Sequence, residues 1–97
     1  MHDPQAKTSN TFPLGHVVAT PGARRAMKRA GVDNRQLLRR HASGDWGDVS
    51  DPEQNDHALQ HGGRLLSVYE INESGETIWI LTEADRSATT FLLPSEY

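Results

Sequence analysis

The spacing of apolar residues changes at Gly62-Gly63, and this change constrains the fold more than any other feature. Before it, apolar residues recur at the three- and four-residue spacing of helices, whereas after it they form short runs between turns. Helices followed by consecutive strands with short connections predict an α+β domain. The chain has 97 residues, which is enough for one small domain.

Two helices are predicted in the first half of the chain. The first helix is predicted from its ends, with Thr20 as N-cap, Pro21 in the first turn and Gly31 as a left-handed C-cap. Its expected inward face consists of Ala23, Ala26, Met27 and Ala30.

The second helix has the clearest local signature. Asp33 is the expected N-cap, Gln36 stands where a capping box places its glutamine, and Val32 and Leu37 have the spacing of a hydrophobic staple. Gly44 ends this helix. A weaker third helix is predicted over 52–61, anchored by Ala58 and Leu59.

Strands are predicted on both sides of the helices. A short strand over 14–19 comes first, and strands over 65–71, 77–82 and 89–93 follow the third helix. The fold class is therefore α+β: a short N-terminal strand, two or three helices, then a three-stranded antiparallel β-meander packed on the helices. Residues 1–12 lack periodicity and are predicted to form a flexible tail ahead of a single domain over 13–97.

Charge is divided between the two halves of the chain. Residues 1–44 hold 8 Lys/Arg and 2 Asp/Glu (+6), and residues 45–97 hold 2 and 11 (−9), which gives the net charge of −3. This excludes a uniformly basic nucleic-acid binder but permits one basic face. The alternative is a solvated face paired with acids of the same domain. The candidate binding residues are Arg24, Arg25, Lys28, Arg29, Arg35, Arg39 and Arg40.

The loop over 41–48 is a second candidate site. Asp45 and Asp48 flank Trp46 and could act as general bases or ligands of a hard metal ion. The alternative is structural, with Trp46 filling the edge of the core and the carboxylates capping turns. The structural alternative is favoured.

The turn over 82–87 supplies the residues of a catalytic alternative. Glu83, Asp85 and Arg86 together with His41 could provide the acid, base and phosphate-binding groups of a small ribonuclease, with Arg64 and Tyr69 as further contributors. In the favoured interpretation these residues have no catalytic role and form a hydrogen-bonded turn.

Metal and cofactor sites are not expected. His57 and His61 have the i, i+4 spacing of a metal site, but the sequence offers no third ligand. The chain contains no cysteine, which excludes disulfides, thiolate zinc sites and a cysteine nucleophile.

Four stretches resemble a known family. They are His41-Ala-Ser-Gly-Asp-Trp-Gly-Asp48 and the residues over 62–67, 79–87 and 92–97. They are similar to short bacterial proteins from plasmids and integrated mobile elements, often called plasmid-related proteins, and the similarity extends from about Leu14 to Tyr97. The resemblance implies a cytoplasmic bacterial protein without an assigned activity or catalytic residues. His57 and His61 depart from the charged residues expected of that family.

Two functions are consistent with these features. The first is a non-enzymatic interaction module that uses the basic helical face to bind nucleic acid or an acidic protein. The alternative is a small ribonuclease with a RelE/barnase-like order of helices and sheet, which the acidic sheet half disfavours.

No membrane association is expected, because no apolar run approaches about 18 residues and the first 13 residues lack the apolar core of a signal peptide. An exposed edge strand would permit a homodimer.

Overall fold

The computed structural model describes residues 11–97. In chain order its elements are β1 (His16–Ala19), α1 (Pro21–Ala30), α2 (Asn34–Ala42), α3 (Pro52–His61), β2 (Leu65–Glu70), β3 (Thr77–Thr82), β4 (Ala88–Leu92) and the 3-10 turn η2 (Pro94–Glu96). This order confirms the predicted α+β fold. None of the helices in this part of the chain is long and apolar enough to cross a membrane.

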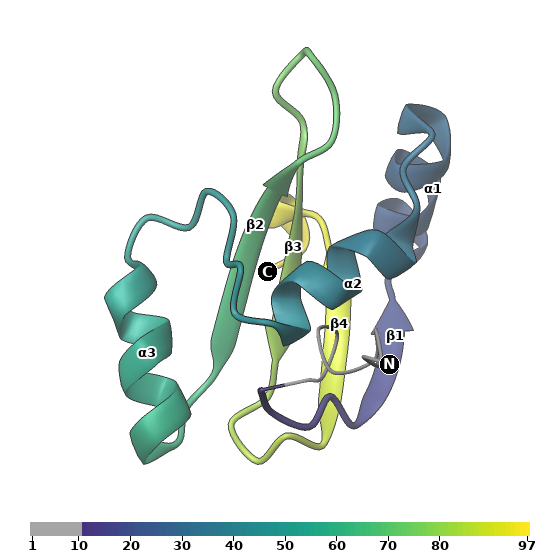
Figure 1. Cartoon of the computed structure of the whole chain (residues 1–97). Helices are drawn as coiled ribbons and strands as arrows, with labels where there is room; N and C mark the ends of the chain where they lie inside the picture. Colours follow the sequence, from purple (N-terminus) through teal and green to yellow (C-terminus); the bar gives the residue numbers. More distant parts are fainter. Residues whose placement is uncertain (1–10) are drawn as a thin grey trace, which may run out of the picture.

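The four strands form one mixed sheet in the order β1-β4-β3-β2 (Figure 1). Strands β2, β3 and β4 make the predicted antiparallel meander, with Ile80 of β3 opposite Ser67 of β2 and Phe91 of β4. Strand β1 pairs parallel with β4, so that Val17 lies opposite Thr89. A parallel pair needs a long connection, and here three helices and two strands separate the partners. The partner of β1 was not predicted from the sequence.

Helix α1 has the predicted caps and a further tertiary one. The Thr20 hydroxyl oxygen accepts a hydrogen bond from the Ala23 N–H at 3.0 Å, and Gly31 is left-handed with φ 70°. The Thr20 hydroxyl also donates to the Glu96 carboxylate at 2.6 Å, and this bond lowers the pKa of Glu96. A carboxylate at a helix N-terminus is stabilised by the helix dipole. The C-terminal turn η2 therefore supplies the negative charge at the start of α1.

Helix α2 begins at the predicted N-cap but lacks the expected capping box. The Asp33 carboxylate accepts from the Arg35 N–H at 2.9 Å, whereas the Gln36 N–H bonds to the Asp33 carbonyl oxygen at 3.1 Å. The capping-box prediction is therefore wrong, because the Asp33 carboxylate accepts from Arg35 and not from Gln36. Leu37 is buried in the main core cluster and Val32 is partly buried against it, so both residues of the predicted staple face the core.

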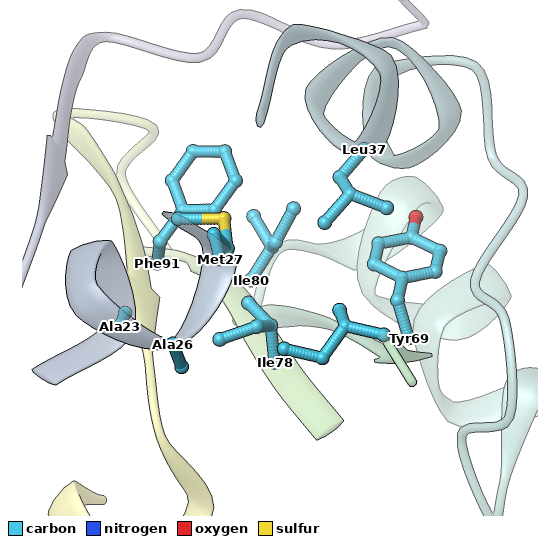
Figure 2. Packing of buried hydrophobic residues seen from close by; sticks show 9 residues of the cluster. Ala23, Ala26, Met27, Leu37, Tyr69, Ile78, Ile80 and Phe91 are labelled. Atoms are coloured by element: carbon cyan, nitrogen blue, oxygen red, sulfur yellow. The ribbon is translucent and has the colours of Figure 1, made fainter. Parts of the chain in front are cut away.

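The main core lies between one face of the sheet and helices α1 and α2 (Figures 1 and 2). Figure 2 shows the small residues of α1 allowing that helix to approach the large side chains of the strands. The residues labelled there are Ala23, Ala26, Met27, Leu37, Tyr69, Ile78, Ile80 and Phe91. Ala23, Ala26 and Met27 are buried and Ala30 packs against the same cluster, which confirms the predicted inward face of the first helix.

A second cluster consists of Phe12, Trp46, Ala58 and Leu65. Phe12 is only 6% exposed, and Thr11 bonds to the Ala42 carbonyl oxygen through its N–H at 2.8 Å and its hydroxyl at 2.9 Å. The tail boundary predicted after residue 12 is therefore wrong, because a single aromatic residue in a polar segment has no periodicity to reveal its burial. The rest of the predicted tail, residues 1–10, lies outside the described residues.

Helix α3 covers the outer edge of β2 through an asparagine. Asn55 is 4% exposed; its amide donates to the Leu66 carbonyl oxygen at 2.7 Å, and its side-chain oxygen accepts from the Leu66 N–H at 3.0 Å. Asn55 and Ala58 anchor α3, whereas the predicted anchor Leu59 is 37% exposed. The Leu59 prediction is wrong because the buried face of α3 is the one that carries Asn55 and Ala58, and Leu59 lies beside that face.

Candidate functional site

Helix α1 presents an exposed row of cations. The Arg29 guanidinium lies 3.4 Å from the Glu76 carboxylate, and both side chains are partly exposed. Arg24, Arg25 and Lys28 form no ion pair with any residue in the range 11–97. These three residues are called the basic surface below; within residues 11–97 the nearest acidic influence on them is the charge attraction between Arg25 and Glu96, which helps to lower the pKa of Glu96.

The cations of α2 are mostly matched within the domain. Arg40 donates to the Asp45 carboxylate at 2.7 Å, and its guanidinium carbon lies 4.5 Å from the centre of the Tyr69 ring. Arg35 lies 3.4 Å from Asp33. Arg39 is exposed and has no ion pair in the described part of the chain. Of the seven predicted binding residues, three therefore form ion pairs within the domain, namely Arg29, Arg35 and Arg40.

Three hollows meet at Arg24. The first, about 380 Å³, lies over Arg25 and Lys28, and the second, about 280 Å³, reaches from Lys28 to the start of α2. The third, about 370 Å³, lies between β1 and the helices and is lined by Val17, Val18 and Asn34. Arg24 lines all three hollows. Cationic groups and apolar side chains thus adjoin on one surface, which suits a protein ligand with acidic and apolar residues.

The loop candidate is largely structural. Trp46 is 7% exposed and packs with Phe12 at a ring-centroid distance of 6.1 Å and with His41 at 5.7 Å, which confirms the predicted core-edge position. Asp45 also accepts from the Gly47 N–H at 3.3 Å, and the Arg40 guanidinium holds the pKa of Asp45 below its usual range. A carboxylate with a lowered pKa is a poor base near neutral pH.

A buried hydrogen-bonded chain runs through His41. Its Nδ1 lies 2.6 Å from the Ser67 hydroxyl and its Nε2 lies 2.8 Å from the Thr82 hydroxyl. The Thr82 and Thr89 hydroxyl oxygens are 2.7 Å apart, and Thr89 donates to the Leu14 carbonyl oxygen at 2.7 Å. These four side chains have 0% exposure.

The Leu14 carbonyl oxygen can only accept a hydrogen bond, and this determines which group donates in every other hydrogen bond of the series. Because Thr89 donates to Leu14, its oxygen accepts from Thr82, and the Thr82 oxygen then accepts from the Nε2–H of His41. The Nδ1 atom is left to accept from the Ser67 hydroxyl. Such a serine–histidine pair resembles an activated nucleophile, but no substrate can reach it without any exposed surface. This series of hydrogen bonds therefore holds α2 to β2, β3 and β4.

This network could not be predicted from local sequence patterns. Its two bonds from His41 join residues 26 and 41 positions apart, so no local spacing reveals them. The available signal was the polar residues at inward positions of the strands, where Ser67, Thr82 and Thr89 alternate with apolar side chains.

The buried position of His41 predicts a pH-dependent stability. Burial lowers the pKa of His41 to about 4 from the ordinary 6.5. Between these values the unfolded chain binds the extra proton, so the free energy of unfolding rises with pH and is lost as pH falls. We expect a loss of roughly 3 kcal/mol from pH 7 to pH 4. Urea unfolding at several pH values measures it, and a flat profile over this window would contradict the assignment.

Arg86 of the catalytic alternative is committed to backbone carbonyls. It adopts a left-handed conformation with φ 62°. Its guanidinium donates to the carbonyl oxygens of Gly63 at 2.6 Å, Glu83 at 2.9 Å and Ala58 at 3.2 Å. It thereby joins the β3–β4 turn to the end of α3, as the structural interpretation of this turn expected.

The other members of that alternative do not share one open site, because His41 and Tyr69 are buried and the rest pair with one another or with the turn. The Glu83 carboxylate lies 3.4 Å from the Arg64 guanidinium, and Asp85 accepts from the Ser87 N–H at 2.9 Å. Tyr69 is 1% exposed, and burial raises its pKa to about 12. Because His41 is buried, it does not share an open surface with Glu83, Asp85 and Arg86. No observation here favours the ribonuclease.

The histidine pair on α3 stands beside a further hollow. The rings of His57 and His61 are 4.4 Å apart between centroids. Residues 11–97 contain no group of three or more His, Cys, Asp or Glu side chains that could hold a metal ion. The hollow of about 410 Å³ between α3 and β2 is lined by His57 and Arg64, and Arg64 also bonds to the Tyr97 hydroxyl at 3.2 Å.

Comparisons with family models, curated proteins and solved structures gave no match for this chain. The resemblance to plasmid-related proteins therefore stays a prediction. A function can therefore be proposed only from the geometry and charge of residues 11–97.

Proposed function

We propose that this chain is a small non-enzymatic interaction module that binds an acidic segment of a protein partner through Arg24, Arg25 and Lys28. The observation that supports this most directly is the basic surface itself. Its three exposed cations have no ion pair within residues 11–97 and surround hollows that meet at Arg24. A bacterial cytoplasmic setting, as the resemblance implies, accords with this proposal.

A protein partner is favoured over nucleic acid by the number of free cations. Strong binding to a nucleic-acid backbone commonly uses about 6–10 phosphate contacts. Here the basic surface supplies three cations, and Arg39 on α2 is a fourth. The chain has a net charge of −3, so the rest of its surface repels a polyanion.

The start of α1 is also occupied. Helix N-termini bind phosphate through their free N–H groups and dipole. In this structure the Glu96 carboxylate lies there, bonded to the Thr20 hydroxyl. An anionic ligand that binds to α1 would therefore lie along the side of this helix, where Arg24 and Lys28 are one turn apart.

Neutralising the basic surface is expected to weaken binding. The probe is a fluorescein-labelled peptide of eight glutamates, and binding is measured by fluorescence anisotropy at increasing salt. The double variant Arg24→Gln/Lys28→Gln should bind about tenfold more weakly at low salt because two direct charge contacts are lost. The difference should shrink as salt screens the remaining charges.

A matched variant separates local contact from net charge. Arg64→Gln removes one charge from a position already paired with Glu83 and outside the basic surface, and it is compared with the single variant Arg24→Gln. Arg64→Gln should change binding less than about twofold. Equal losses in both variants, or tighter binding of a labelled DNA duplex than of the peptide, would overturn the proposed function.

A further inference from the structure

The two outer edges of the sheet differ in how they are protected. At the β2 edge, Asn55 bonds to both backbone groups of Leu66. The next outward residue, Val68, donates to the Trp46 carbonyl oxygen at 3.0 Å and accepts from the Asp48 N–H at 2.7 Å. The β2 edge is thus closed to a further strand at both positions.

The β1 edge is open within the described part of the chain. The N–H groups of His16 and Thr20 bond to the carbonyl oxygens of Ser87 and Phe91, each at 3.0 Å. Because successive residues of a strand alternate in direction, the backbone groups of Val17 and Ala19 point away from β4. No residue in the range 11–97 hydrogen-bonds to them from outside.

The side chains of β1 do not guard this edge. Natural edge strands are commonly blocked by Lys, Pro or a bulge, and β1 has the sequence His-Val-Val-Ala. Val17 is 44% exposed and Val18 is 51% exposed. The hollow of about 370 Å³ is lined by these two residues and Ala19, by Arg24 and Asn34 on its helical side, and by Phe91 of the neighbouring strand β4.

We propose that an extended acidic segment of a protein partner adds as a fifth strand to the outer edge of β1. This inference rests on the proposed function, because Arg24 and Lys28 would bind the carboxylates of that segment. The outward backbone groups of Val17 and Ala19 would pair with its main chain. Strand addition of this kind takes its affinity from main-chain bonds and its specificity from alternate side chains.

Charge complementarity selects an acidic partner segment over a second copy of this chain. If two copies paired through β1, each would bring the residues flanking that strand to the edge of the other. Residues 11–22 contain no Asp or Glu. A second copy would therefore leave the basic surface unmatched.

The test uses two peptides that differ only in their ability to form a strand. The first is a fluorescein-labelled peptide of four Glu-Val repeats, and the second is the same peptide with alternate backbone amides N-methylated. Methylation removes the donors of one edge and keeps the charge. We expect the methylated peptide to bind at least about tenfold more weakly to the full chain.

Hydrogen exchange of single amides gives a readout that charge alone would not move. In the free chain the Val18 amide, which faces β4, should be protected, and the Val17 and Ala19 amides should exchange quickly. Saturation with the unmethylated peptide should slow exchange at Val17 and Ala19 and leave Val18 unchanged.

A proline variant tests the same edge from the protein side. Val17→Pro removes an outward N–H and no bond to β4, so the sheet should remain intact. It should weaken binding of the Glu-Val peptide at least about tenfold, while Val17→Thr, which keeps the N–H, changes binding little. Should Val17→Pro unfold the chain, the methylated peptide and the exchange data decide alone.

The outcomes separate the two proposals. Equal binding of both peptides, or unchanged exchange at Val17 and Ala19, would overturn strand addition and leave charge-driven binding intact. No binding of either peptide, together with no effect of Arg24→Gln/Lys28→Gln on the octaglutamate probe, would overturn both. A stable dimer that Val17→Pro dissociates would assign the edge to a second copy instead.

Discussion

Replacing His41 with alanine is expected to lower the free energy of unfolding by about 3–5 kcal/mol at pH 7. The imidazole is fully buried between the Ser67 and Thr82 hydroxyl groups. Alanine would leave both hydroxyls without this partner and would open a cavity next to Phe12 and Trp46, whose rings lie 5.3 and 5.7 Å from that of His41. Desolvated polar groups and a cavity each destabilise a small domain strongly.

Chemical denaturation followed by tryptophan fluorescence measures this loss. The control is His57→Ala, which truncates an exposed histidine on α3 and should change stability by less than about 0.5 kcal/mol. His41→Ala should also remove most of the pH dependence between pH 4 and 6.5 that wild type shows. If both histidine variants lost the same small amount, the buried network would not stabilise the fold.

Replacing Gly47 with alanine is expected to cost about 3 kcal/mol or more. Gly47 is left-handed with φ 68°, a conformation that disfavours a side chain by about 1 kcal/mol. A methyl group there would also strike the Val68 carbonyl oxygen and come 2.7 Å from Cδ1 of Tyr69. The Val68 carbonyl oxygen is backbone within a paired strand, so it cannot move without breaking its bond to Asp48.

Gly31→Ala is the matched control for the backbone strain. Gly31 has nearly the same conformation, φ 70°, but a methyl group there would meet nothing within 4 Å. It should cost about 1 kcal/mol, so the difference between the two variants isolates the contact between the loop and β2. Equal losses would mean that the loop moves away from β2 freely.

Local sequence signals predicted the elements well because their causes are local. Thr20, Pro21 and Gly31 bound α1 through hydrogen bonds and backbone angles within a few residues. The same holds for Asp33 as the N-cap of α2 and for the turns of the meander. The exposed cations of α1 could also be predicted, since they lie off the apolar face of that helix.

Pairings between distant residues could not be predicted in the same way. Asn55 was missed because its partner is the backbone of Leu66, which any residue would supply. Phe12 was assigned to a tail because the residues that bury it, His41 and Trp46, follow much later in the chain.

The sequence by itself determined the order of helices and strands, their caps and the basic surface, because these depend on spacing and on the chemistry of neighbouring residues. Only the tertiary structure decided which of those cations remain free and which strand edge remains open. Arg40 is neutralised by Asp45, whereas Arg24 meets no acid within residues 11–97. Charge pairing and edge protection depend on distances between elements, and folding sets those distances through the packing of the core.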